Sequence, residues 1–132
     1  MSQENVEIVR QAIEGFNERD LDAATRHAHP DIEVDWSRSL GVEANVYRGR
    51  EATRRFWATF FDAFDRIVVV PTELIEHADC VIVCDETRMW GRDGIEVRAR
   101  NVGVVTLQDG RIIRWRLCRD RAEALKAVGL EE

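Results

Sequence analysis

The sequence predicts a single α+β domain in which helices cover one face of a curved antiparallel sheet. Apolar residues recur mainly at helical spacing up to residue 64, and the period becomes two from residue 67 onward. Two Asp-Gly pairs, at residues 93–94 and 109–110, separate alternating runs, as expected for hairpins. A length of 132 residues suits one domain with a substantial core, so we expect residues 1–132 to form one unit.

Two helices are predicted at the start of the chain. The first ends near Asn17, because apolar side chains recur at helical spacing along one face of it, at Val6, Val9, Ile13 and Phe16. Asp20 is a suitable N-cap for a short second helix over residues 21–28, and Pro30 lies just beyond its end.

A strand and an aromatic helix follow. Residues 32–36 alternate between apolar and acidic side chains up to a tryptophan, which predicts a strand, and a polar loop extends from there to about residue 47. The predicted helix over residues 51–64 carries an aromatic stripe with Phe56, Phe60 and Phe64 four residues apart. We expect this helix to be the most deeply packed one.

The second half of the chain is predicted to contain four long strands, at residues 67–75, 80–90, 95–108 and 111–119. Pro71 predicts that the first of them lies at an edge of the sheet. The Asp-Gly pairs place antiparallel hairpins between the last three. Asp120 then caps a final helix over residues 121–128, which Gly129 closes.

Charge and composition exclude several functions. The net charge of −6 argues against sequence-independent binding of nucleic acid or of an anionic membrane, because both need a surplus of Lys and Arg. No apolar run approaches the roughly 18 residues of a membrane helix. The first residues are polar and acidic, unlike a signal peptide, so we expect a cytoplasmic protein. Eighteen of the 19 basic residues are arginine, which fits either anion recognition or a codon preference.

The sequence predicts no metal site, no cofactor and no disulfide framework. Cys80 and Cys84 would lie about 13 Å apart on one strand, too far to share a metal ion, and three cysteines without a secretory signal do not suggest disulfides. His27 and His29 fall at a helix end with no third ligand placed beside them. Neither a Gly-rich phosphate loop nor a Gly-x-Ser-x-Gly elbow is present.

Four segments in this order resemble the nuclear transport factor 2-like superfamily, and within it the SnoaL-like branch. They are Asn-Glu-Arg-Asp-Leu-Asp at 17–22, His-Pro-Asp-Ile-Glu-Val-Asp-Trp at 29–36, Tyr-Arg-Gly-Arg-Glu at 47–51, and Leu-Gln-Asp-Gly-Arg-Ile-Ile-Arg-Trp at 107–115. The resemblance covers nearly the whole chain. It implies a cone-shaped domain in which helices cover the concave face of the sheet and enclose an apolar cavity, with an outer sheet face often used for dimerisation.

The resemblance alone does not decide the function. The fold hosts ketosteroid isomerase, polyketide cyclases, limonene epoxide hydrolase, scytalone dehydratase and binding modules without catalysis. The catalytic positions of the hydrolase pattern fall at Cys84, Glu86 and Leu117, and only Glu86 keeps a carboxylate. Those of the isomerase pattern fall near Asp35, Ala12 and Gly103, and only Asp35 keeps its chemistry. Neither mechanism transfers intact to this chain, so its function has to be inferred from the residues of its own site.

Comparison with the family implies which side chains face the cavity. On the strand over residues 80–90 the implied inward set is Ile82, Cys84, Glu86, Arg88 and Trp90. On the next two strands the implied set includes Asn101, Gly103, Trp115 and Leu117, with Arg119 at the end of the last strand. A shift of one residue would exchange a whole set for its neighbours.

Glu86 is the leading catalytic candidate on this assignment. A carboxylate that faces an apolar cavity has a raised pKa and becomes a useful base or acid near neutrality. Arg88, two residues along, would stabilise the carboxylate or orient a carbonyl-bearing ligand, and Arg119 completes the polar part of the ligand-binding set. The structural alternative is a buried ion pair of Glu86 with Arg88 or Arg119, without catalysis.

The remaining candidates complete a cavity for a lipophilic ligand. Asp35, at the end of the first strand, is the second candidate base, with a solvated carboxylate as the alternative. Asn101 could donate a hydrogen bond to a developing oxyanion, or it could have only a structural role within the sheet. Trp36, Trp90 and Trp115 would form flat walls suited to ring-shaped ligands, or simply fill the core.

These features predict a cofactor-independent cyclase, isomerase or dehydratase that moves protons on a small lipophilic carbonyl compound. The alternative is a non-catalytic module for small-molecule binding or dimerisation. The opposite sheet face mixes charged residues, many of them arginine, with valines, which is typical of an interface, so we expect a homodimer through this outer face. A further possibility is a monomer that binds another partner there.

Overall fold

The computed structural model describes residues 2–41 and 43–130. Its elements are, in chain order, α1 (Ser2–Asn17), α2 (Leu21–Ala24), β1 (Ala28–Asp35), β2 (Val46–Arg48), α3 (Arg50–Ala63), β3 (Arg66–His77), β4 (Cys80–Trp90), β5 (Glu96–Gln108), β6 (Arg111–Cys118) and α4 (Arg121–Ala127). The predicted α+β class, with helices early and long strands late, is confirmed.

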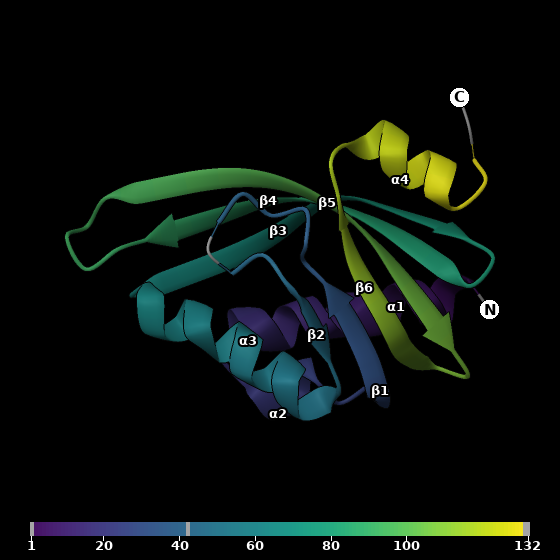
Figure 1. Ribbon diagram of the computed structural model, residues 1–132, viewed down its shortest axis with the longest axis horizontal. Coiled ribbons are helices and arrows are strands. Elements are labelled where there is room, and N and C mark those ends of the chain that lie inside the picture. Colours follow the sequence, from purple (N-terminus) through teal and green to yellow (C-terminus); the bar gives the residue numbers. More distant parts are fainter. Residues whose placement is uncertain (1, 42, 131–132) are drawn as a thin grey trace.

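The strands form one curved sheet in the order β2-β1-β6-β5-β4-β3 (Figure 1). The four long strands pair antiparallel, as predicted, and β3 lies at the edge with Pro71 at a shift in register. The pairing of β1 with β6 is parallel, and the sequence patterns did not predict it. It joins the N-terminal strand to the C-terminal one, so residues far apart in the sequence share one sheet.

Two apolar clusters lie on the two faces of this sheet. On the concave face, Val9 and Ile13 of α1 and Phe56 of α3 pack against inward residues such as Val83 and Val105. On the outer face, helix α4 packs against the sheet through five buried residues, Ile82, Val104, Cys118, Ala124 and Leu125. The early helices therefore cover the concave face, as expected, whereas α4 covers part of the opposite face (Figure 1).

Tertiary pairing changes two of the predicted boundaries. The second helix, expected over residues 21–28, ends at Ala24, and β1 already begins at Ala28, which pairs with Ile112 of β6. The segment expected to be loop contains the short strand β2, which pairs with β1. In both places a neighbouring strand offers backbone hydrogen bonds that a local sequence pattern does not reveal.

Local signals for the two caps and for the turn between β5 and β6 were reliable. Asp20 accepts a hydrogen bond from the Ala23 backbone N–H at 3.1 Å, as a helix N-cap does. Asp120 accepts one from the Glu123 N–H at 2.8 Å. At the turn between β5 and β6, Asp109 and Gly110 have φ values of 52° and 77°, which a tight hairpin requires.

The junction after α1 anchors the edge strand. The Asn17 side chain donates from Nδ2 to the Val69 carbonyl at 2.9 Å, and its Oδ1 accepts from the Val69 N–H at 2.8 Å. This pair of bonds satisfies both backbone groups of one residue on an edge strand, which otherwise lack a partner. It fixes the end of α1 against β3, where both elements form a wall of the site.

Among the described residues, no helix is long and apolar enough to cross a membrane.

Candidate functional site

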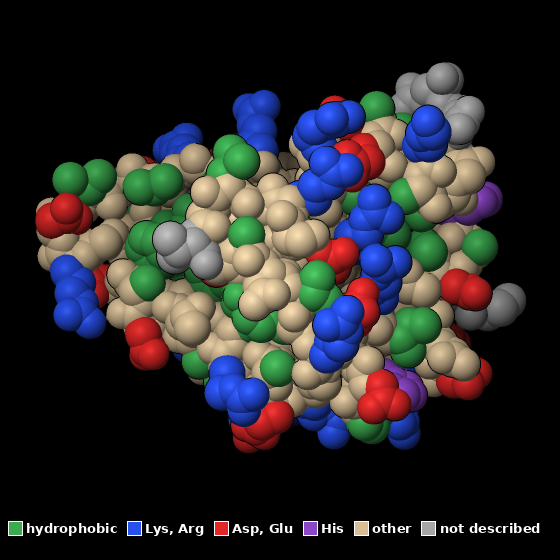
Figure 2. All heavy atoms as spheres, viewed as in Figure 1, with side chains coloured by type: hydrophobic (Ala, Val, Ile, Leu, Met, Phe, Trp, Pro, Cys, Tyr) green, Lys and Arg blue, Asp and Glu red, His purple; other side chains and the backbone are tan. Residues whose placement is uncertain are grey.

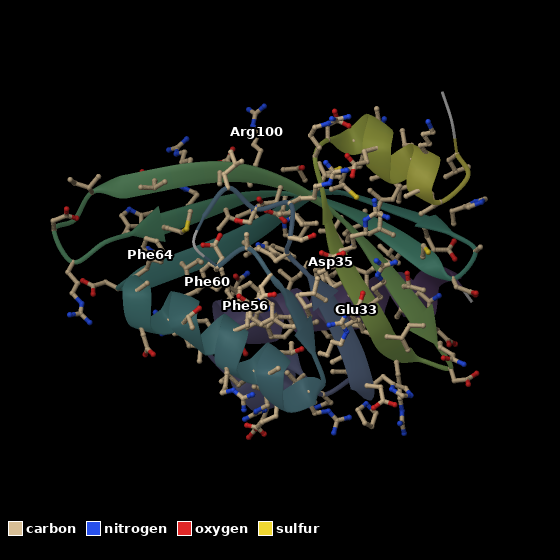
Figure 3. All side chains as sticks on the ribbon, viewed as in Figure 1. Glu33, Asp35, Phe56, Phe60, Phe64 and Arg100 are labelled. Atoms are coloured by element: carbon tan, nitrogen blue, oxygen red, sulfur yellow. The ribbon has the colours of Figure 1, made fainter. Side chains whose placement is uncertain are left out.

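A pocket of about 750 Å³ lies between the concave face of the sheet and helices α1 and α3. Its walls are largely aromatic: Phe16, Trp36, Phe56, Trp57, Phe60, Phe64 and Trp115. Phe56 and Phe60 lie one turn apart on α3, as the spacing predicted, and Phe64 is the C-cap residue just after the helix (Figure 3). The sheet supplies the opposite wall from β4, β5 and β6. Such an apolar pocket with a few polar groups is the common form of a small-molecule site.

The pocket-facing side of β4 is the opposite of the one predicted. Asp85, Thr87 and Met89 line the pocket, whereas Glu86, Arg88 and Trp90 alternate with them and do not. The inward placement of Glu86, Arg88 and Trp90 was therefore wrong. Asp85 takes the inward position that the sequence comparison assigned to Glu86.

The physical reason is the length of the loop between β4 and β5. A two-residue turn at residues 93–94 would pair Glu86 with Asn101. The loop instead spans residues 91–95, so that Asp85 pairs with Asn101. Because cross-strand partners share a face, the inward placement of Asn101 requires Asp85 beside it. The placement failed because the register of the β4–β5 hairpin was predicted wrongly. The alternating pattern within β4 was predicted correctly.

All five residues of the implied inward set on β4 belong to the outer face, since Ile82 and Cys84 lie in the cluster beneath α4 and Glu86, Arg88 and Trp90 share their side of the strand. Arg88 forms its ion pair with Glu96, at 2.7 Å, rather than with Glu86. The Arg88 guanidinium also lies 5.3 Å from the centre of the Trp90 ring, and that of Arg66 lies 4.9 Å from it. Trp90 is therefore engaged in cation–π contacts on the outer face instead of forming a wall of the pocket.

Asp35 also lies outside the pocket. It accepts hydrogen bonds from Ser37, 3.1 Å from the backbone N–H and 2.6 Å from the hydroxyl, and lies 3.5 Å from the Arg114 guanidinium. The neighbouring Val34 is buried in the concave core, so alternation turns Asp35 to the other face (Figure 3). Its expected place at the cavity mouth was wrong.

The surroundings of Asp35 favour a permanently ionised carboxylate. Burial works against ionisation, but the hydrogen bonds from Ser37 and the charges of Arg114 and Arg116 outweigh it, so the pKa of Asp35 lies below its ordinary value. Ion pairs with arginines of β6 continue along β1, because Glu33 lies 3.2 Å from Arg114. Figure 2 shows acidic and basic side chains alternating in a band over β1 and β6. This band stabilises the parallel pairing that sequence patterns did not predict.

We expect an Asp35→Asn substitution to lower stability at pH 7 and to have little effect near pH 2. A lowered folded-state pKa means that the stabilisation is present above the unfolded value, about 3.9, and disappears as the pH falls through the folded value. Urea unfolding of both proteins at several pH values measures the difference. An equal loss of stability at all pH values would contradict the electrostatic explanation.

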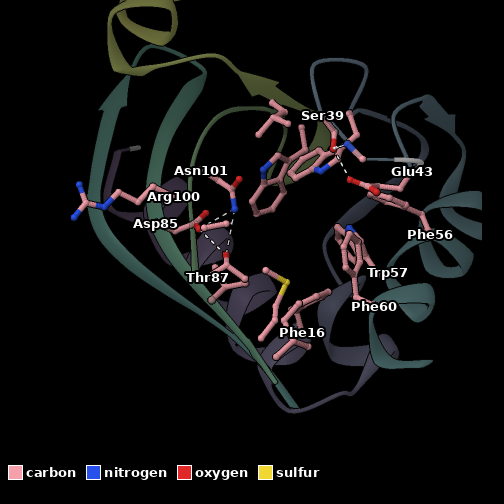
Figure 4. A pocket seen from close by; sticks show the side chains of 18 of the residues that line it. Phe16, Ser39, Glu43, Phe56, Trp57, Phe60, Asp85, Thr87, Arg100 and Asn101 are labelled. Atoms are coloured by element: carbon pink, nitrogen blue, oxygen red, sulfur yellow. Dashed lines mark hydrogen bonds between the residues drawn. The ribbon is translucent and has the colours of Figure 1, made fainter. Parts of the chain in front are cut away.

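Asp85, Thr87 and Asn101 form a connected polar group on the sheet wall of the pocket (Figure 4). The Thr87 hydroxyl donates to Asp85 Oδ1 at 2.8 Å. The Asn101 amide donates from Nδ2 to the same oxygen at 3.4 Å and to Thr87 Oγ1 at 3.3 Å. Both side-chain hydrogen bonds to Asp85 thus use Oδ1, which leaves Oδ2 as the oxygen available to a ligand.

The environment of Asp85 suits proton transfer. Burial raises the pKa of the Asp85 carboxyl, and the hydrogen bonds from Thr87 and Asn101 offset only part of this increase. The carboxylate faces aromatic side chains across the pocket, where Phe16, Trp57 and Phe60 lie (Figure 4). A carboxyl with a raised pKa in an apolar pocket can accept and return a proton close to neutral pH.

Trp115 forms the neighbouring part of the sheet wall, and Gly103 makes room for it. A Cβ at Gly103 would lie 3.1 Å from Trp115 Nε1 and 3.2 Å from the Arg116 carbonyl oxygen. The Trp115 indole N–H donates no hydrogen bond to another described residue. Among the described residues no buried side-chain nitrogen lacks a partner, so this N–H is accessible, and because Trp115 lines the pocket we take it as a donor for a bound molecule.

A Gly103→Ala substitution is expected to displace the Trp115 indole and destabilise the fold by about 1–3 kcal/mol, the usual range for overpacking. The methyl group has no space, since both the indole and a backbone oxygen lie within 3.2 Å of its position. Urea unfolding together with the near-ultraviolet circular dichroism of tryptophan measures both effects. Unchanged stability and spectrum would show that the indole moves aside freely.

Four of the predicted ligand-binding residues do line the pocket, namely Trp36, Asn101, Trp115 and Arg119. Trp57 of α3, next to Phe56 of the aromatic stripe, also lines the pocket, whereas Trp90 does not. Arg38 and Arg119 are exposed residues of the lining and so mark the mouth of the pocket. Arg100 also lines it, although its side chain points away from the interior (Figure 4).

The two histidines of the predicted helix end have local partners. His27 Nε2 lies 3.0 Å from Gln11 Oε1, and His29 Nδ1 accepts a hydrogen bond from the Asp31 N–H at 3.0 Å. Within residues 2–41 and 43–130, no three His, Cys, Asp or Glu side chains are grouped as ligands for one metal ion.

Solved structures with the same fold cover almost all of this chain. An NTF2-like protein from Burkholderia pseudomallei is 21% identical, with 96% of this chain and 98% of that chain covered and a TM-score of 0.77. TerC, co-crystallised with polyporic acid, is 22% identical over 95% and 97% of the two chains, with a TM-score of 0.78. A protein from Sinorhizobium meliloti described as a candidate polyketide cyclase is 26% identical over 85% and 94%, with a TM-score of 0.68.

A comparison with curated proteins finds no match to this chain. The family model described as the SnoaL-like domain matches residues 9–115, which include α2, α3 and every strand except the last residues of β6. The fold and this match agree with one another. The chain therefore belongs to the SnoaL-like domain family.

Proposed function

We propose that this protein is a cofactor-independent acid/base catalyst for a small lipophilic carbonyl compound, acting as an isomerase, cyclase or dehydratase. The observation that carries the proposal is Asp85, a carboxyl group whose pKa is raised by burial beside an aromatic pocket. The role that the sequence suggested for Glu86 passes to Asp85. The type of chemistry is unchanged, because Asp85 has the same functional group on the side of the strand that lines the pocket.

The proposed step is transfer of a proton next to the carbonyl group. Asp85 Oδ2 takes the proton from that carbon, an O–H bond forms as the C–H bond breaks, and the electron pair moves into an enolate. In a ligand with a conjugated double bond the enolate is a dienolate, and return of the proton from Asp85 to its far carbon completes an isomerisation. In a cyclisation the enolate carbon attacks a second carbonyl group of the ligand, and the alkoxide that forms takes the proton back from Asp85, which restores the carboxylate.

The neighbouring side chains have distinct roles in this proposal. Thr87 and Asn101 hold Asp85 through Oδ1, so they position the carboxylate. The enolate oxygen needs a hydrogen-bond donor, and the Trp115 indole N–H on the same wall supplies one. Asn101, expected from sequence to be the oxyanion donor, is a positioning residue in this arrangement, because its Nδ2 already bonds to Asp85 and Thr87.

Relatives in fold support a small organic ligand. TerC was co-crystallised with polyporic acid, and the Sinorhizobium meliloti protein is described as a candidate polyketide cyclase. Both likenesses concern the fold, so the chemistry of this chain depends on its own pocket. The aromatic walls and the volume of about 750 Å³ fit a ligand of two to four fused rings.

Exchange of protons next to a carbonyl group tests the proposal directly. The protein is incubated in D₂O with methyl 2-naphthyl ketone, 2-tetralone and a 3-ketosteroid, and deuterium uptake is followed by NMR. Catalysed, saturable uptake by at least one ketone is the expected result. Binding without any catalysed uptake, detected by quenching of tryptophan fluorescence, would instead identify a non-catalytic binding module.

We also propose a homodimer through the part of the outer sheet face that α4 leaves uncovered. In this region Val70, Glu86 and Arg100 form one row across three strands, and Val70 is 44% exposed. A two-fold axis lets Arg100 of one copy approach the partner's Glu86, which makes the row self-complementary.

Sedimentation measures the assembly. The wild-type protein is expected at twice the mass of the chain, and Val70→Arg, which adds a charge to the exposed row, at the mass of one chain. A monomeric wild-type protein would contradict the dimer and leave this face to another partner.

A further inference from the structure

Three arginines converge on one carboxylate beside the mouth of the pocket. Glu123 of α4 lies 3.3 Å from Arg38 and 3.4 Å from Arg116 through Oε1, and 3.8 Å from Arg119 through Oε2. Arg38 comes from the loop after β1, and Arg119 follows β6. The side chain of Glu123 is only 13% exposed, whereas those of Arg38 and Arg119 are 51% and 72% exposed.

The first turn of α4 holds Glu123 in place. Asp120 caps the helix through the Glu123 N–H, at 2.8 Å, and Glu123 Oε2 accepts from the Arg119 N–H at 3.4 Å. Glu123, the third residue of the helix, therefore reaches back past the N-cap to the residue before it, one residue further than in a standard capping box. The helix that covers the outer face thereby fixes a carboxylate at the edge of the sheet, and this carboxylate anchors the two mouth arginines.

The pocket lining does not share the negative charge of the whole protein. The chain carries −6, whereas the lining holds two carboxylates and two arginines at its mouth, Arg38 and Arg119, and the side chain of a third arginine, Arg100, points away from the interior (Figure 4). Arg38 and Arg119 share Glu123 with Arg116, so one largely buried carboxylate faces three guanidinium groups, and within the described residues Arg119 has a further contact with Asp120, at 3.7 Å. Guanidinium groups with spare N–H donors recognise carboxylates and other oxyanions.

We propose that Arg38 and Arg119 bind the acidic group of an amphiphilic ligand whose ring system occupies the aromatic pocket. The substrate class of the site is then a lipophilic acid, with its carboxylate or ionised enol held at the mouth and its rings beside Asp85. This inference shares its pocket with the proposed function, but it requires no catalysis. The apolar walls bind the rings, and the two arginines select for the negative charge.

A matched pair of ligands tests this selection. Isothermal titration calorimetry compares 2-naphthoate with methyl 2-naphthyl ketone, which has nearly the same shape and no charge. The wild-type protein is expected to bind 2-naphthoate more tightly, and added salt to reduce this preference. In the Arg38→Gln/Arg119→Gln variant, affinity for 2-naphthoate falls roughly tenfold while affinity for the ketone is unchanged, as expected for two partly exposed charge contacts.

The control is the Arg26→Gln/Arg111→Gln variant, which changes the net charge equally at two exposed arginines outside the pocket lining. It is expected to bind both ligands like the wild type. If both double variants lost the same affinity for 2-naphthoate, the loss would come from the change in net charge, and the proposal would be overturned. A wild-type protein that binds the ketone as tightly as 2-naphthoate would overturn it as well.

The outcome separates this inference from the proposed catalysis. Arginine-dependent binding of 2-naphthoate without deuterium exchange of the ketone supports the arginine site and refutes the catalytic proposal. Deuterium exchange of the ketone without any preference for 2-naphthoate supports the catalytic proposal and refutes the arginine site. If neither compound binds at millimolar concentration, both proposals are wrong.

Discussion

An Asp85→Asn variant is expected to lose deuterium exchange of bound ketones by about 10²- to 10⁴-fold, the usual contribution of a general acid or base. An amide cannot accept the proton, but its oxygen can still accept the hydrogen bond that Thr87 now gives to Asp85 Oδ1. The pocket and its aromatic walls stay in place. Ligand binding, measured by tryptophan quenching, should therefore change much less than the exchange rate.

The same variant should be at least as stable as the wild type at neutral pH. The pKa of Asp85 is raised in the folded state, so the native protein holds this proton more tightly than the unfolded chain. Stability then falls as the pH rises from the unfolded value, about 3.9, through the folded value, and is level above it. The uncharged amide of the variant has no such loss, so the variant's advantage in the free energy of unfolding should grow over this range.

The matched control is Glu86→Gln, the neighbouring carboxyl group on the other side of β4. It removes one negative charge, as Asp85→Asn does, but outside the pocket lining. We expect it to keep wild-type exchange. Loss of exchange in Glu86→Gln with normal activity in Asp85→Asn would show that the register of β4 is wrong.

A Phe56→Ala variant is expected to lose about 3–5 kcal/mol of stability, the range for truncating a buried phenylalanine. Phe56 is 3% exposed and stacks on Tyr47 with ring centres 4.0 Å apart. Its ring also contacts Trp36 and Phe60 edge-on, at 5.9 and 5.3 Å between centres. The substitution therefore removes the centre of an aromatic cluster, and the pocket beside it offers no atoms to fill the space.

Urea unfolding followed by far-ultraviolet circular dichroism measures this loss. Leu40→Ala is a suitable control, because Leu40 lines the pocket mouth yet is fully exposed, and its truncation should change stability by less than about 0.5 kcal/mol. A loss below about 1 kcal/mol in Phe56→Ala would mean that neighbouring rings collapse into the space. The pocket would then be deformable, contrary to the rigid aromatic wall described above.

Much of the fold was predictable from local patterns. The aromatic stripe of α3, the caps at Asp20 and Asp120 and the tight turn at Asp109 depend on neighbours close by in the sequence, and all were found as predicted. Pro71 correctly indicated an edge strand, because a missing N–H has the same consequence in any sheet. Asn101, Trp36, Trp115 and Arg119 were also placed correctly along the pocket.

The sequence by itself determined the order of the main elements and the presence of two faces on each strand. It also supplied the carboxylates, tryptophans and arginines of the proposed chemistry, which are present whatever the register. Only the tertiary structure decided which carboxylate meets the pocket. Strand alternation does not say which of its two faces points inward, so Asp85 and Glu86 fit the same sequence pattern. A shift of one residue in the pairing of β4 with β5, set by the loop between them, decides which of the two carboxylates lines the pocket. The convergence of Arg38, Arg116 and Arg119 on Glu123 likewise joins segments from opposite ends of the chain, because the parallel pairing of β1 with β6 brings them together.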